Sequence, residues 1–282
     1  MLQEAGSPCQ MANSTKAAPR RRGAALKNRK YGKPPVHEVI VSVHFQRALD
    51  EKRLLALRER LAASFSKIDA QNLTQVQMGM DPTGQAFQGA VSQFAGWLAR
   101  DEGWVLQAGA SELTLHLVRP GAWPSGEYAG WSVIYERFLK LHASLADVYG
   151  PLEPKRAGLR YLNRIAIPQG EPVAKWLTFP WAESDLLRDL YTFNVRLTWA
   201  RAGDADDLSA TIGLAKITIL DPVFAANNEG VLLDIDVFNL WIPKAPLYEQ
   251  LPDWFQRAHK IENQLFESLI TQPLRERFEE QE

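Results

Sequence analysis

VHEVIVSVHF, the sequence of residues 36–45, alternates apolar and polar side chains with the period of two that is typical of a β-strand. The next segment changes period, because Leu54, Leu57, Leu61 and Phe65 follow the spacing of one helical face and predict a helix over residues 51–65. A β-then-α opening is compatible with a parallel α/β sheet or with an antiparallel α+β fold. The rest of the chain decides between them.

Strands dominate the remaining chain. Alternating patterns predict strands at residues 72–80, 104–109, 112–118, 157–167, 191–199, 208–219 and 230–241. Apolar stripes predict a long helix that ends at Gly150, a short helix at Val173–Phe179, and a closing helix with Pro252 in its first turn. Neighbouring strands are joined by connections too short for parallel crossovers. We therefore predict an α+β fold in which long amphipathic helices cover antiparallel sheet.

The order of elements repeats along the chain. Residues 34–150 give β-α-β-β-β-α, and residues 151–282 give β-β-β-β-α, with no literal repeat of sequence. The closing helix is expected to bury a stripe of Trp254, Ala258, Ile261, Leu265 and Leu269. We predict a single body, residues 34–282, made of two similar halves.

A basic arm precedes this body. The first 33 residues contain eight Lys or Arg and one acid, Glu4, so they carry +7, and the net charge of −1 leaves −8 on the remaining 249 residues. The arm has almost no large apolar side chains, which predicts disorder. It is expected to contact nucleic acid through phosphates or to act as a solubilising tail.

Composition and missing motifs narrow the function classes. The single cysteine, Cys9, excludes an intrachain disulfide and a Cys-based metal site, and it favours a reducing cytoplasm. No apolar run is long enough to span a membrane, and no signal peptide is apparent. The phosphate-binding, dinucleotide-binding, nucleophile-elbow and zincin motifs are absent, so no cofactor is expected.

One hexapeptide suggests a partner. Residues 75–80, QVQMGM, match the loose pattern of peptides that dock on bacterial sliding clamps, with Gln75 followed by apolar Val76, Met78 and Met80. Such a peptide binds extended, with the amide at the rim of a pocket and the apolar side chains in a cleft. The alternative is that residues 75–80 form an ordinary strand edge with no binding role.

Two pairs of charged residues are candidates for a metal site and an anion site. Asp234 and Asp236 share one strand face and have the geometry to hold a divalent metal, or they pair with arginines on neighbouring strands. Arg160 and Arg164 also share a face and suggest an anion site. Asn163 falls on the opposite, apolar side, where a buried amide needs partners.

Five segments together resemble a known family: PPVHEVIV at 34–41, YAGW at 128–131, GLRYLNRIAIP at 158–168, LDIDVF at 233–238 and HKIENQLFESLIT at 259–271. The family is bacterial, sporadically distributed and mostly of undefined function, and the resemblance covers residues 34–280. The chain also looks like a bacterial toxin that inhibits DNA replication by occupying the sliding clamp. That resemblance implies a non-enzymatic toxin of a toxin–antitoxin pair, whose partners are the clamp and an antitoxin that delivers it to a protease.

Three function hypotheses remain open from the sequence. The first is the cytoplasmic clamp-binding toxin, with Gln75, Val76, Met78 and Met80 as the binding residues and no catalytic ones. The second is a metal-dependent enzyme of the phosphodiesterase or nucleotidyl-transfer type that uses Asp234 and Asp236. The third is a nucleic-acid-binding module led by the arm.

Overall fold

The computed structural model describes most of the folded body. The described residues are 29–80, 86–118, 128–150, 153–168, 170–178, 194–200, 208–219, 228–239 and 248–281, and the side chains of residues 73–94, 194–200, 216–219 and 228–229 are outside the description. Most of the predicted arm, residues 1–28, also lies outside it.

A nine-stranded sheet forms the centre of the molecule, and each strand runs antiparallel to its neighbours in the order β3-β4-β5-β6-β2-β7-β10-β9-β8. Its strands are β2 Val36–Phe45, β3 Lys67–Met80, β4 Ala86–Asp101, β5 Trp104–Gly109, β6 Glu112–Val118, β7 Pro154–Ala166, β8 Asn194–Ala200, β9 Leu208–Ile219 and β10 Asn228–Asn239. The α+β prediction is confirmed. β4 is an additional strand that the sequence analysis did not predict.

The two halves of the chain meet in the middle of this sheet. β2 and β7, the strands that open each half, pair with each other, and Val41 lies opposite Leu159. In each half, the strand that comes last in the sequence lies next to this central pair, so β6 flanks β2 and β10 flanks β7. The repeat of element order therefore corresponds to a repeat of strand arrangement about the β2–β7 junction.

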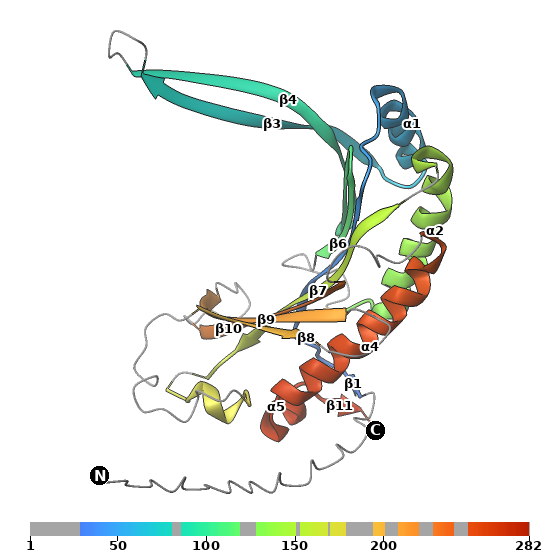
Figure 1. Ribbon diagram of the computed structural model, residues 1–282. Coiled ribbons are helices and arrows are strands. Elements are labelled where there is room, and N and C mark those ends of the chain that lie inside the picture. The colour runs from blue at the N-terminus through green and yellow to red at the C-terminus, as the bar shows by residue number, and fades with distance from the viewer. Residues whose placement is uncertain are drawn as a thin grey trace, which may run out of the picture.

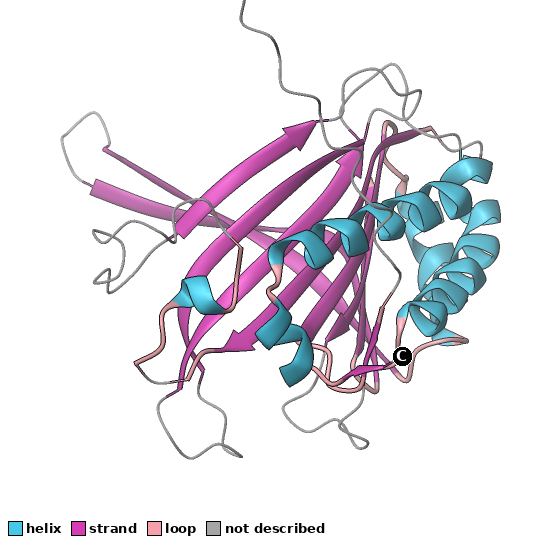
Figure 2. Cartoon of the chain, turned by 90° about the horizontal axis from the view of Figure 1, so that it is seen from below, coloured by secondary structure: helices cyan, strands magenta, loops and turns pink. Residues whose placement is uncertain are grey.

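Helices cover one face of the curved sheet (Figures 1 and 2). They are α1 Glu51–Ala62, α2 Trp131–Tyr149, α4 Leu251–Leu269 and α5 Gln272–Arg277, with short 3-10 helices η1 Val173–Lys175 and η2 Tyr248–Gln250. Phe138 of α2 packs edge-on against Phe255 of α4, with ring centroids 4.7 Å apart, so one core spans both halves. In the described part of the chain, no helix has the length and apolar character needed to cross a membrane.

The end of the predicted arm belongs to the folded body. Lys30–Tyr31 forms strand β1, which pairs with β11, Glu280–Gln281, near the C-terminus. The backbone N–H groups of Gly32 and Lys33 donate to the carbonyls of Glu279 and Phe278. The predicted boundary at residue 33 is therefore too late, because local composition does not reveal this long-range pairing.

The β3–β4 hairpin leaves the sheet at a bulge. Gln71 lies opposite Gly96 and Asn72 opposite Phe94, so Ala95 is the extra residue that bends β4. Gly96 has φ of +149°, and a Cβ there would lie 2.3 Å from the carbonyl oxygen of Ala108. Only glycine fits where the hairpin turns away from β5.

Candidate functional site

The clamp-like hexapeptide lies in the outer part of the β3–β4 hairpin. Residues 75–80 of β3 pair with residues 86–91 of β4, and β3 is the edge strand of the sheet. β4 pairs with β5 only from Gly96 to Asp101, so among the described residues the outer hairpin pairs with nothing else. It extends away from the body at the upper left of Figure 1. Gln75, Val76, Met78 and Met80 thus have a described backbone, while their side chains lie outside the description.

The predicted acidic pair is on the sheet face that the helices leave uncovered, and each carboxylate meets an arginine. Arg160 donates twice to Asp234, from Nε at 2.7 Å and from Nη2 at 2.6 Å. Arg156 donates to Asp236 at 3.3 Å. The hydrogen bonds with Asp234 raise the pKa of Arg160 above its ordinary value. No group of three or more His, Cys, Asp or Glu in the described ranges has a metal-binding arrangement.

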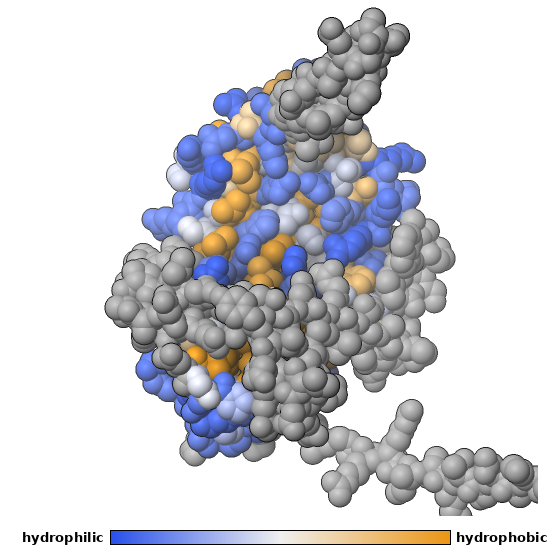
Figure 3. Space-filling model, turned by 90° about the vertical axis from the view of Figure 1, so that its left-hand side faces the viewer, coloured by the Kyte–Doolittle hydropathy of each residue, from blue (hydrophilic) through white to orange (hydrophobic). Residues whose placement is uncertain are grey.

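Arg160 is therefore held by Asp234 in a bidentate ion pair. An anion site at Arg160 and Arg164 would need both guanidinium groups to be available to the anion. Arg164 lies exposed farther along the same strand. On the uncovered face, hydrophilic and hydrophobic residues lie side by side (Figure 3). A third pair links β2 to β6, where Glu38 lies 2.7 Å from Nδ1 of His116. Asn163 points the other way, is 1% exposed, and donates to the Leu233 carbonyl at 3.3 Å.

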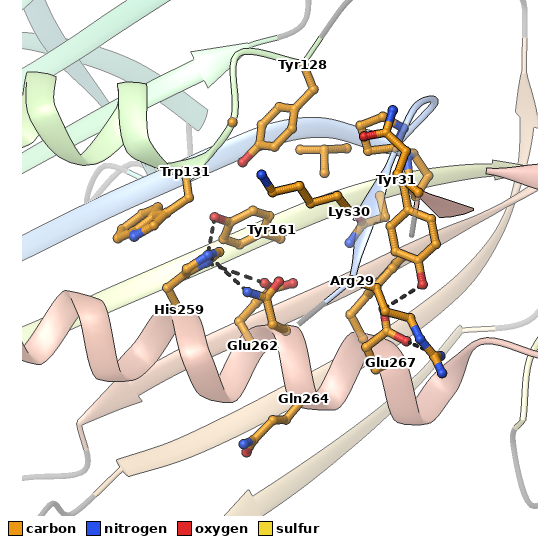
Figure 4. A pocket seen from close by; sticks show the side chains of 18 of the residues that line it. Arg29, Lys30, Tyr31, Tyr128, Trp131, Tyr161, His259, Glu262, Gln264 and Glu267 are labelled. Carbon is orange, nitrogen blue, oxygen red and sulfur yellow. Dashed lines mark hydrogen bonds and ion pairs between the residues drawn. The ribbon is translucent and has the colours of Figure 1, made fainter. Parts of the chain in front are cut away.

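A separate cavity of about 590 Å³ lies under β1, on the helix-covered side of the sheet. Its walls come from the N-terminal segment 29–36, the start of α2, β7 and α4. Figure 4 shows that three side chains converge on it: Tyr128 from the residues before α2, Tyr161 from β7 and Lys30 from the N-terminal segment. This volume lies within the range of about 300–1,000 Å³ that small-molecule sites occupy.

His259 of α4 is held between partners on both ring nitrogens. Asn263 Nδ2 lies 3.0 Å from Nε2, and the Tyr161 hydroxyl lies 3.1 Å from Nδ1. The indole of Trp131 stacks on the imidazole, with centroids 4.5 Å apart and planes 20° apart. Burial lowers the pKa of His259 to about 4, so the ring is neutral at pH 7. Because Asn263 donates to Nε2, the ring proton sits on Nδ1 and donates to Tyr161, whose own O–H is left to donate elsewhere.

Glu262 lies one helical turn along α4 and is 3% exposed. Its carboxylate is 4.0 Å from His259 Nδ1, and no other ion pair or hydrogen bond of this carboxylate occurs among the described residues. Burial raises its pKa to about 8. The cavity therefore contains a carboxyl group that is largely protonated at neutral pH.

Glu267 is a second buried acid on α4, and it is fully paired. Arg29 donates to it at 3.1 Å, Arg275 at 3.2 Å and the Tyr31 hydroxyl at 2.6 Å. Arg29 also pairs with Glu280 at 2.8 Å. This cluster fixes β1 across α4 and so closes one side of the cavity.

This cavity was not predicted from the sequence. Ile261 and Leu265 were predicted to lie in the buried stripe of the closing helix, but Glu262 and Phe266 occupy its core-facing positions. The two aliphatic residues are only partly buried. The signal available in the sequence was the series Phe255, Ala258, Glu262, Phe266 and Leu269, which keeps helical spacing and includes one acid.

No protein-family model matches the chain, and no curated protein matches it significantly.

Proposed function

We propose that the chain is a non-enzymatic toxin of a toxin–antitoxin pair that acts in the cytoplasm by binding the DNA polymerase sliding clamp. The observation that carries the proposal is the position of QVQMGM on an edge strand that extends beyond the body. The resemblance of the chain to the replication-inhibiting toxin SocB favours the same partner. A cognate antitoxin that delivers the protein to a protease belongs to this proposal.

The recognition mode is that of an extended peptide. An edge strand offers one row of unpaired backbone groups, and apolar side chains at its outer end fill a cleft on the partner. Occupying the clamp in this way would exclude the polymerase that uses the same cleft. This mechanism needs no catalytic residue.

The two alternatives have less support. An enzyme based on Asp234 and Asp236 would have to release both carboxylates from Arg160 and Arg156 before they hold a metal. The arm-led nucleic-acid module depends on residues 1–28, which lie outside the described residues.

Binding to purified clamp tests the proposal. The full chain should bind immobilised clamp, and Gln75→Ala/Met78→Ala should weaken binding at least about tenfold, the loss of roughly 1.4 kcal/mol. Gln71→Ala, at the base of the same strand, is the matched control and should bind like wild type. Undiminished binding by the double variant refutes the assignment to residues 75–80, and no binding by wild type refutes the clamp as partner.

A further inference from the structure

The cavity under β1 has no role in the proposed function. Several of the groups that line it offer hydrogen-bond donors or positive charge to the interior. The cavity does not involve the β3–β4 hairpin. Ligand binding in the cavity and clamp binding by the hairpin can therefore be tested separately.

The first donor group is the N-terminus of α2. Gly130, Trp131 and Ser132 line the cavity, and the first intrahelical bond runs from Ile134 N–H to the Gly130 carbonyl. Gly130 provides no capping side chain, and the first turn contains no acid. No described residue accepts a hydrogen bond from the N–H groups at the start of this 19-residue helix. These groups can therefore bind an anion, with the helix dipole in the favourable direction.

The second group is the Tyr128 hydroxyl, two residues before the helix cap. It lines the same cavity, and its oxygen atom is buried and interacts with the Tyr161 hydroxyl. The O–H of Tyr128 itself has no acceptor among the described residues. Burial raises the pKa of Tyr128 above its ordinary value, so the group remains an O–H donor. A buried O–H group without an acceptor is unfavourable, and an acceptor bound in the cavity would satisfy it.

The charges around the cavity also favour an anion. Lys30 lines the mouth and is exposed, its side chain extends toward Tyr128 and Tyr161 in Figure 4, and it forms no ion pair with a described residue. Glu267 is already neutralised by Arg29 and Arg275. Glu262 holds its proton up to about pH 8, so it adds a donor and no opposing charge at neutral pH.

Aromatic rings supply the remaining walls. The Trp131 indole is stacked with His259, and Tyr31 meets Phe266 edge-on with centroids 6.2 Å apart. Flat apolar surfaces of this kind bind planar ring systems. We propose that the cavity under β1 binds a small molecule with an anionic head, a carboxylate or a phosphate, on a planar aromatic body. The head lies at the N-terminus of α2 beside Tyr128 and Lys30, and the body lies along Trp131.

Calorimetric titration of the full chain at pH 7 with three probes tests this site. 2-Naphthoate, 2-naphthyl phosphate or both should bind, and the tighter of the two identifies the head group. 2-Naphthylmethylammonium, with the same ring and the opposite charge, should not bind. Preference for the ammonium probe would mean that Glu262 ionises to hold a cation, and it would overturn the proposal, as would a failure of both anions to bind.

Variants locate the head group. Tyr128→Phe and Lys30→Gln should each weaken anion binding about five- to tenfold, because each removes one donor to a charged acceptor. Lys33→Gln, a nearby exposed lysine outside the cavity, should bind like wild type. Binding that is unchanged in both cavity variants would show that the probes bind elsewhere and would refute the site.

The response to pH provides a second readout. The titratable groups around Glu262 are His259 on its own helix, Tyr161 on β7, Tyr128 ahead of α2 and Lys30 at the mouth. Glu262 gains a negative charge between pH 7 and pH 9, and this charge repels an anion. Anion affinity should fall several-fold over this range in wild type and stay nearly constant in Glu262→Gln. A parallel fall in the variant would exclude Glu262 from the site.

Discussion

At the scale of single residues, Glu262 and His259 give the fold an unusual dependence on pH. Burial raises the pKa of Glu262 to about 8, so above the ordinary pKa of a glutamate the folded protein holds a proton that the unfolded chain has released. Stability therefore falls as pH rises toward 8. His259 acts oppositely, because its lowered pKa of about 4 makes the unfolded chain bind the extra proton below pH 6.5. The two effects largely cancel between about pH 4.5 and 6.5.

Glu262→Gln should remove the alkaline part of this profile. From pH 6.5 to 8 only Glu262 contributes, so the free energy of unfolding of wild type should drop by up to about 2 kcal/mol, at about 1.4 kcal/mol per pH unit. The variant keeps a neutral side chain of the same shape and should show no such drop. Urea unfolding at both pH values measures the difference, and Glu59→Gln on the exposed side of α1 is the control. Equal slopes in wild type and Glu262→Gln would contradict the buried, protonated state.

Asp234 should contribute to stability through Arg160. The carboxylate side chain is 13% exposed and accepts two hydrogen bonds, so Asp234→Asn should cost about 1–3 kcal/mol. A double-mutant cycle with Arg160→Met should give a coupling energy above about 1 kcal/mol. Asp147→Asn breaks the exposed pair with Arg60 and should change stability by less than about 1 kcal/mol. If Asp234→Asn is no more costly than Asp147→Asn, the pair is not structural.

At the scale of elements, the outer β3–β4 hairpin should be dispensable for folding. Asn72 lies opposite Phe94, so replacing residues 73–93 with a two-residue Asn-Gly turn closes the hairpin at its base. The melting temperature should stay within about 4 °C of wild type, which corresponds to about 1 kcal/mol, while clamp binding disappears. A thermal melt and a pull-down on the same preparation measure both. A trimmed chain that does not fold would show that the hairpin supports the body.

The end of the N-terminal segment, in contrast to the hairpin, should be required for stability. Deleting residues 1–33 removes Arg29 and Tyr31 from Glu267, a carboxylate that is 6% exposed, and should cost about 2–4 kcal/mol. Deleting residues 1–28 retains every contact of β1 and should leave the unfolding free energy within about 0.5 kcal/mol of wild type. Chemical denaturation of the two truncations compares them. Similar stabilities would mean that Arg275 alone is enough to neutralise the buried charge of Glu267.

At the scale of the whole molecule, the sequence predicts the pattern of strands and helices better than the polar interior. Strand β2 follows a regular period and was predicted at its bounds, and the end of helix α2 was predicted within one residue. β4 was missed because Gly89 and Gly96 resemble turn signals and the bulge at Ala95 breaks its alternation. β1 and Glu262 were missed because basic or acidic residues are normally exposed, and only long-range contacts reveal that these are packed.

Continuity of the sheet through β2 and β7 predicts that neither half folds alone. A fragment of residues 29–150 would expose the β2 edge, and a fragment of residues 151–282 would expose β7 together with the Phe255 side of α4. Each fragment should be unfolded or aggregated alone, and the two should form a folded complex when coexpressed. Circular dichroism and size-exclusion chromatography follow the outcome. Cooperative unfolding of either isolated fragment would show that the halves are independent domains.

The pairing of β1 with β11 makes the folded chain nearly a closed ring. Lys30 lies opposite Gln281, so a linker of a few residues can join these two positions without disturbing either strand. The backbone can then be opened elsewhere, for instance in the segment between α2 and β7 where one half passes into the other. Such a circular permutant would keep every strand neighbour and exchange the order in which the two halves are synthesised.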